Sequence, residues 1–169
     1  MGSTFDPTTD SHPAPLEESE VLEIIRPQSQ DLPVVFASPH SGNRYPESFI
    51  KASRLDPAAL RKSEDSFVDE IFAAAPRFGA PLIKALFPRA YMDPNREPFE
   101  LDPDMFADDL PSYVNVHSPR VAAGLGTIAR VVASGEDIYR DKLSFAEAAE
   151  RINTLYRPYH RALQELIEE

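Results

Sequence analysis

The sequence predicts an α/β sandwich built around a mostly parallel central sheet. Two apolar runs, LPVVFAS at 32–38 and APLIKALF at 80–87, are typical of buried strands, and the segment 57–77 between them has the apolar spacing of a helix. Because parallel strands need a crossover connection, this order favours two parallel strands in one sheet, with the helix packed on a face.

The elements of this unit carry local signals. EVLEIIRP at 20–27 is predicted to be a short strand that precedes the two apolar runs. Asp56 followed by Pro57 is a typical N-cap with proline at the first helical position. Gly79 is a typical stop, so the helix over 57–77 has both a predicted start and a predicted end.

The remainder of the chain alternates irregular and regular structure. Segment 88–120 is rich in prolines and acids and is predicted to be a long surface loop, which is usually either functional or disordered. GTIARVV at 126–132 is predicted to be a strand. Ser144 and Glu147 form a predicted capping box that begins a helix over 145–168.

Composition limits the class of protein. With 169 residues and 42% hydrophobic content, one domain over 19–169 is expected, preceded by a disordered leader or expression remnant at 1–18. The sequence contains neither the roughly 18 apolar residues of a membrane span nor a signal-peptide pattern, so a cytoplasmic protein without a membrane partner is expected. The absence of cysteine leaves His, Asp, Glu and water as metal ligands.

The net charge of the chain bears on its partners. It is −11, from 17 basic and 28 acidic residues, and it argues against a nucleic-acid partner because it repels phosphate groups. Solubility alone is the other interpretation of this charge. Acidic residues gather near both ends, in LEESE and ELIEE, so the excess does not by itself describe a site.

A histidine, His40, follows the strand at 32–38 in the turn SPHSG. In open α/β sheets the ligand crevice lies beyond the carboxyl ends of the strands, so this position favours a functional histidine. The alternative is a histidine that serves only as a hydrogen-bonding partner within the turn.

An acidic cluster lies in SEDSFVDE at 63–70, where Asp65 and Asp69 are four residues apart beside Glu64. At this spacing the two aspartates share one helical face. This is either a solvated acidic face or the source of an oxygen ligand that completes a metal site with a histidine.

A second cluster, in PRAYMDPNREP at 88–98, follows the second apolar run. Arg89, Asp93, Asn95 and Arg96 lie together there in a turn bracketed by prolines. A guanidinium in such a turn binds a carboxylate through two hydrogen bonds, and an amide adds a donor. A purely structural ion pair between arginine and aspartate is the alternative.

Five motifs occur in the order and with the spacing found in the N-formylglutamate amidohydrolase family: SPHSGNRYP, EDSFVDEIF, PRAYMDPNR, SPRVAAGLGTIARVV and YRPYHRAL. The sequence resembles this family from about residue 30 to its last residue. The resemblance implies a zinc-carboxypeptidase-like (phosphorylase/hydrolase-like) fold, a three-layer α/β/α sandwich with a mostly parallel or mixed sheet. It also implies a zinc-dependent amidohydrolase of histidine breakdown that cleaves the formyl amide of N-formylglutamate to formate and glutamate.

The resemblance assigns residues to the metal and to the substrate. It implies that His40 is a zinc ligand and that Asp65 is the acidic residue of the metal site. Asn95 and Arg96 are similar to the pair with which the wider carboxypeptidase-like group holds a substrate carboxylate. The expected partner is therefore a small molecule, an N-formyl or N-acyl amino acid with a carboxylate.

Recognition of a dicarboxylate needs more than one positive group. Arg89 and Arg44 are further candidates for substrate binding, and Arg89 with Asp93 is also expected to support the loop. The resemblance assigns no catalytic base and no third metal ligand within this sequence.

Family members continue past the equivalent of helix 145–168 into a strand that ends in an Asp-x-His-Ser-x-Pro type motif, a source of another histidine ligand. This sequence has no such motif, and neither His117 nor His160 matches it. Three functions stay open: formyl-amide hydrolysis, hydrolysis of another N-acyl amino acid, and a non-catalytic remnant that binds a ligand or partner. The difference predicts weak zinc binding, little amidase activity and an uncovered sheet edge, with self-association into a homo-oligomer or reduced stability.

Overall fold

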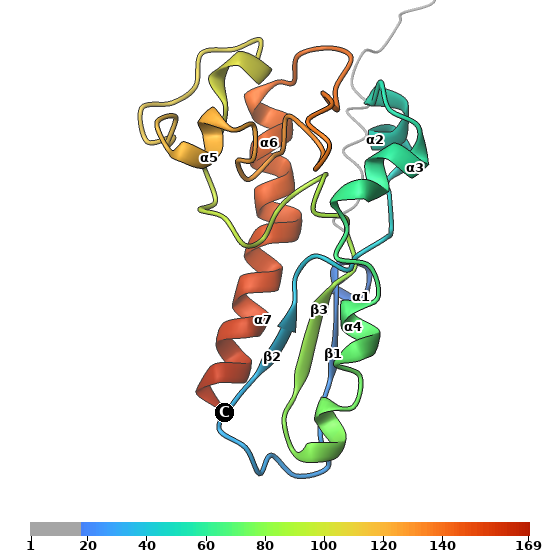
Figure 1. Ribbon diagram of the computed structural model, residues 1–169. Coiled ribbons are helices and arrows are strands. Elements are labelled where there is room, and N and C mark those ends of the chain that lie inside the picture. The colour runs from blue at the N-terminus through green and yellow to red at the C-terminus, as the bar shows by residue number, and fades with distance from the viewer. Residues whose placement is uncertain (1–17) are drawn as a thin grey trace, which may run out of the picture.

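The computed structural model describes residues 18–169 and contains a three-stranded mixed sheet (Figure 1). Strand β3, Leu82–Ala85, lies between the antiparallel β1, Leu22–Ile25, and the parallel β2, Phe36–Ser38. The prediction that the two apolar runs share a sheet as parallel neighbours is confirmed, and the α/β class is confirmed with it. The predicted leader lies outside the described residues, except for its last residue.

The strands are shorter than the apolar runs that predicted them. The run at 20–27 divides into a helical turn, α1 (Glu18–Val21), and β1. In the run at 32–38 only the last three residues pair with another strand. Leu32 and Val34 are 42% and 46% exposed. The prediction that this run is a strand covered on both faces is therefore wrong, since Leu32 and Val34 lie before β2 and outside the sheet.

The prediction of a single helix over 57–77 is wrong. The structure has four short pieces there: α3 (Pro57–Leu60), η1 (Arg61–Ser63), α4 (Val68–Ile71) and η2 (Ala75–Phe78). Asp56 caps the first piece as predicted. The break falls at Phe67, whose φ of 67° is left-handed, and close to it the Asp65 amide donates to the His40 carbonyl at 3.1 Å. A tertiary bond thus takes an amide that a continuous helix would use internally.

The predicted strand at 126–132 is also wrong. Within the described chain this segment forms one isolated bridge, from Val131. Its backbone bonds to other loops instead; the Asp93 amide, for example, donates to the Thr127 carbonyl at 2.8 Å. Ile128 is fully buried between these loops. Burial between loops therefore produces the same apolar run as a strand.

The predicted helix over 145–168 is confirmed, including its start. Its first part is α6 (Phe145–Arg151), and the capping box is present. Ser144 accepts a hydrogen bond from the Glu147 amide, and the Glu147 carboxylate accepts one from the Ser144 amide.

A π turn interrupts this long helix. The turn, η4 (Ile152–Tyr156), joins α6 to α7 (Arg157–Glu168). Pro158 lies just after it, lacks the amide hydrogen of an ordinary residue, and would bring its ring against the carbonyl four residues earlier. The wider π turn accommodates this proline within an otherwise continuous helix.

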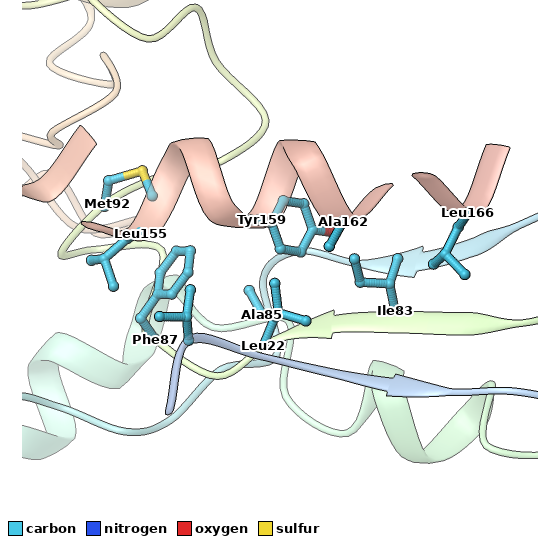
Figure 2. Close-up of a cluster of buried hydrophobic side chains, with 10 residues drawn as sticks. Leu22, Ile83, Ala85, Phe87, Met92, Leu155, Tyr159, Ala162 and Leu166 are labelled. Atoms are coloured by element: carbon cyan, nitrogen blue, oxygen red, sulfur yellow. The ribbon is translucent and has the colours of Figure 1, made fainter. Parts of the chain in front are cut away.

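One face of the sheet packs against η4 and α7 (Figure 2). Tyr159 and Leu166 of the helix and Ile83 of β3 lie in this core and are almost completely buried. The buried members of the cluster are Val21, Leu22, Ile83, Ala85, Phe87, Met92, Leu155, Tyr159, Ala162 and Leu166. The opposite face carries the short α4, and there Phe72 contacts Phe36 with ring centroids 5.3 Å apart. The complete three-layer sandwich and its carboxypeptidase-like class stay predictions.

The segment 88–120 is irregular, as predicted, and it is ordered by cores of its own. Its regular pieces are the short η3 (Pro103–Met105) and the first residues of α5 (Pro119–Ala122). One cluster of buried residues consists of Leu101, Met105, Phe106, Val114, Ile128, Leu143 and Ala148. A second joins Phe49, from α2 (Glu47–Ala52), to Ala90 and Ile138, among others. Over 18–169, no helix is long and apolar enough to span a membrane.

Candidate metal and carboxylate site

His40 lies two residues beyond β2, in a turn whose shape is fixed by its neighbours. Ser38 and Ser41 are joined through their hydroxyl groups at 2.7 Å, and the Ser41 hydroxyl also donates to the Asp65 carbonyl at 2.9 Å. Gly42 is needed here because a Cβ would lie 2.2 Å from the carbonyl oxygen of Phe87. The SPHSG sequence therefore places a 7% exposed histidine beyond the end of the strand, as predicted.

Both ring nitrogens of His40 face carboxylates. Nδ1 lies 3.2 Å from Oδ2 of Asp65, and Nε2 lies 2.8 Å from Oδ1 of Asp93. The two aspartates differ in exposure, since the Asp65 side chain is 50% exposed and that of Asp93 is 6% exposed. The buried Asp93 is the stronger partner and orients the imidazole ring.

Asp93 is also the centre of the turn that the sequence singled out. Arg89 Nη2 donates to its carboxylate at 2.9 Å, and the Asn95 amide donates at 2.9 Å. Burial by itself raises the pKa of Asp93, but the hydrogen bond and charge of His40, with Arg89 and the neighbouring amide, lower it to about 2. Asp93 is therefore an ionised, buried carboxylate at neutral pH.

The two arginines of this turn surround the same carboxylates. Arg89 also approaches Asp65, with Nη1 3.6 Å from Oδ1, and Arg96 Nη2 lies 3.7 Å from Oδ2 of Asp93. Arg96 is further fixed because its Nε donates to the Leu125 carbonyl at 3.0 Å. The structure thus brings together His40, Asp65, Arg89, Asp93 and Arg96, with Asn95 exposed beside them.

The remaining candidates lie elsewhere. Arg44 is on the wall of a separate cavity of about 590 Å³, together with Tyr91 and Arg151, and its role in substrate binding stays a prediction. In the acidic cluster, Asp69 pairs with Lys84 at 3.4 Å. Glu64 accepts a hydrogen bond from the Tyr45 hydroxyl at 2.8 Å. These two acids hold the fold together and do not join Asp65 around His40.

Two possible metal donors among the described residues lie close together. The 3.2 Å between His40 Nδ1 and Asp65 Oδ2 is close to the separation of two donors that each lie about 2.0 to 2.2 Å from a tetrahedral zinc. Asp93, which accepts from the other ring nitrogen, is the carboxylate partner that metal-bound histidines usually have. Over 18–169, no group of three or more His, Asp or Glu side chains is arranged to hold a metal. His40 and Asp65 could therefore supply two ligands to a metal ion, with Asp93 as the partner of the histidine.

A small cavity opens beside these groups. Its volume is about 230 Å³, and Arg89 and Asp93 form its polar wall. Leu125, Ala129 and Val131 are among its apolar lining residues. Such a cavity suits a small molecule with one charged end, because the polar groups orient it and the apolar residues exclude water.

Comparison with known proteins agrees with this geometry. A sequence model described as N-formylglutamate amidohydrolase matches residues 32–169. The chain belongs to the N-formylglutamate amidohydrolase family. A crystal structure of N-formylglutamate amidohydrolase from Ralstonia eutropha JMP134 is similar, with 39% sequence identity and a TM-score of 0.80. The match covers 88% of this chain and 52% of the Ralstonia chain, so this chain spans about half the length of that relative. A search of curated proteins found no match.

Sequence reasoning missed two residues that contact the site from the long helix. From the sequence, His160 is a candidate only as a metal ligand, and Tyr156 enters only as the first residue of the motif YRPYHRAL. In the structure both bond to backbone carbonyls of the turn after Asp93. Their spacing of four residues, which places two side chains on one helical face, was the available signal.

Proposed function

We propose that this chain carries the histidine and carboxylate-binding part of an amidohydrolase that cleaves the formyl amide of N-formylglutamate, or the amide of a related N-acyl amino acid. The observation that supports this most is the pairing of His40 with two aspartates, beside a turn that carries two arginines. Membership of the family supports the reaction class, and the Ralstonia relative is named for this activity.

Zinc is the metal in this proposal, and His40 Nδ1 and Asp65 are its ligands from the described residues. When bound, zinc polarises a carbonyl oxygen and makes a bound water more acidic. Asp93 accepts the Nε2 hydrogen of His40 and so selects the tautomer that leaves Nδ1 free for the metal. Because Asp93 stays ionised, it keeps this tautomer at neutral pH.

Substrate carboxylates are held by the arginines in this proposal. Arg96 and the exposed Asn95 bind one carboxylate, and Arg89 contributes a second positive group. The charges of Arg89 and Arg96 are offset by those of Asp65 and Asp93, which lie within 4 Å of them. A divalent cation therefore adds the net positive charge that a dicarboxylate substrate needs.

The proposed reaction is a hydrolysis. The oxygen of a water molecule bonds to the formyl carbon, and the bond from that carbon to nitrogen breaks. One proton of the water passes, by way of a carboxylate acting as general base, to the amine of the leaving glutamate. The products are formate and glutamate, and no oxidant or other reactant is needed.

Formate release tests this proposal. We expect that the chain, joined to the part of the Ralstonia protein that it does not cover, releases formate from N-formylglutamate when zinc is added. Replacement of His40 with Ala should abolish the release, whereas replacement of the exposed His117 with Ala should leave it unchanged. N-acetylglutamate and N-formyl amino acids with apolar side chains define the acyl group and the side chain that are preferred. Equal turnover in the His40→Ala variant would remove the histidine from the reaction.

A second candidate is a non-catalytic module that binds a small ligand. The observation that favours it is that the described residues supply two metal ligands, whereas a catalytic zinc usually has three from the protein. For the 169-residue chain alone we expect weak zinc binding by calorimetry and little formate release. Tight, stoichiometric zinc binding with full turnover by this chain would contradict the second candidate.

A further inference from the structure

Two side chains of the long helix bond to the turn that carries the arginine and asparagine. His160 Nε2 donates to the Pro94 carbonyl at 2.7 Å, and the Tyr156 hydroxyl donates to the Arg96 carbonyl at 2.8 Å. The two rings stack, with centroids 4.1 Å apart and planes at 30°. The helix therefore binds the backbone of the turn on both sides of Asn95.

The turn is also held at its start, where the Asp93 amide donates to the Thr127 carbonyl at 2.8 Å and the Asn95 amide donates to Asp93 Oδ1 at 2.9 Å. It contains no strand or helix, and the carbonyl of Asn95 is bonded by the Arg96 guanidinium itself, at 2.7 Å. A backbone outside regular structure keeps one conformation only where its polar groups find fixed partners. The carbonyls of Pro94 and Arg96 find theirs in the helix.

The helix is a rigid support at this point. Leu155 and Tyr159, which directly precede Tyr156 and His160, are 4% and 2% exposed in the core against the sheet. The π turn ends at Tyr156, and π turns inside helices are frequent at functional sites. Tyr156 and His160 therefore connect the turn to the buried core between the helix and the sheet.

We propose that Tyr156 and His160 are positioning residues, which set the conformation of the turn 93–96 and so the aim of Asn95 and Arg96 at a substrate carboxylate. The substrate carboxylate in this inference rests on the proposed function, whereas the two hydrogen bonds do not depend on it. The residues act through the backbone and touch neither the metal ligands nor the cavity beside Arg89 in the described structure.

The first measurement is hydrogen exchange of the Asn95 amide, which bonds to Asp93 Oδ1 at 2.9 Å. We expect the double variant Tyr156→Phe/His160→Leu to exchange this amide about tenfold faster than the unchanged chain, since two hydrogen bonds of ordinary strength are lost. The single variant His160→Gln places an amide donor near the position of Nε2, so exchange of the Asn95 amide should stay slow in it. Tyr113→Phe and His117→Leu, at exposed positions, are the matched controls and should change nothing.

The second measurement is binding of N-formylglutamate by calorimetry, with thermal unfolding as a check that each variant is folded. The double variant should bind at least fivefold more weakly, and His160→Gln should bind within twofold of the unchanged chain. Zinc affinity should move less than carboxylate affinity, because His40 and Asp65 lie outside the turn.

The outcomes separate the two proposals. Unchanged exchange of the Asn95 amide in a folded double variant would overturn the positioning role. Faster exchange together with no binding of N-formylglutamate by the unchanged chain would support the positioning role and count against the proposed substrate. If the double variant exchanges the Asn95 amide faster but binds N-formylglutamate as tightly as the unchanged chain, the claim that these two hydrogen bonds position Arg96 for a carboxylate would be overturned.

Discussion

The two carboxylates that flank His40 are held in opposite ways. Asp93 is 6% exposed and lies within 4 Å of the His40 ring and of the guanidinium groups of Arg89 and Arg96. Asp65 is 50% exposed and lies on a segment that is broken into short turns. The difference shows which half of the site is built by the described residues: the support of the histidine is rigid, and the proposed metal side is open.

Packing explains this difference. The turn of Asp93 rests on the long helix and on the core that the helix forms with the sheet. The segment of Asp65 leads into α4, where Phe67 and Ile71 are 64% and 71% exposed. Few apolar contacts hold that segment, so its opening costs less free energy than opening of the Asp93 turn.

Removal of the buried charge should have the largest effect. We expect Asp93→Asn to lower the free energy of unfolding by about 3 kcal/mol, because it leaves the hydrogen bonds of Arg89 and His40 without their anion. The matched change Asp65→Asn should cost less than about 1 kcal/mol, since exposed ion pairs contribute little. Urea denaturation of both variants at neutral pH measures the two values. Equal losses would mean that the two sides of His40 are equally rigid.

Lowering the pH should gradually remove the stabilisation that the ionised Asp93 carboxylate contributes to the fold. The pKa of Asp93 is about 2 in the fold, below the value of about 3.9 for an unfolded aspartate. A lowered pKa stabilises the fold above the unfolded value, so the gain is complete above about pH 4 and is lost as the pH falls toward about 2. This difference corresponds to about 2 kcal/mol.

The control for the acid prediction is Asp93→Asn, because other carboxylates titrate in the same range. The gap in unfolding free energy between the unchanged chain and this variant should shrink by about 2 kcal/mol from about pH 5 to about pH 2. A gap that stays constant would show that the Asp93 carboxylate is not the group responsible.

The arginine of the rigid turn should control substrate affinity. In the chain joined to the remaining part of the Ralstonia protein, we expect Arg96→Lys to lower kcat/KM for N-formylglutamate about tenfold, since an ammonium group cannot form the bidentate contact. Arg120→Lys, at an exposed position far along the loop, is the control. Unchanged kinetics would remove Arg96 from the substrate site.

The sequence predicted the turns better than the extent of the elements. The turns that carry His40, Asp93 and Arg96 are predicted correctly, because proline, glycine and charged residues mark a turn whatever surrounds it. The prediction of one helix over 57–77 is wrong because the Asp65 amide bonds to the His40 carbonyl. This is a contact between segments that local spacing does not show. The role of His160 is hidden for a related reason: its spacing from Tyr156 indicates a shared helical face, but its partner is a backbone carbonyl, which the sequence does not identify.

The exposed apolar face should give the smallest effect on stability. Phe78 is 72% exposed at the end of η2, and Phe67 and Ile71, in the same stretch of the chain, are also exposed. We expect Phe78→Ser to change the free energy of unfolding by no more than about 0.5 kcal/mol, because little apolar area leaves or enters water. Leu166→Ala, on the well-packed face, should instead cost about 3 kcal/mol. Exposed aromatic groups also favour association between molecules, so sedimentation of the unchanged chain should show self-association that Phe78→Ser reduces. A loss of stability in Phe78→Ser as large as that in Leu166→Ala would show that this face is as well packed as the face under the helix.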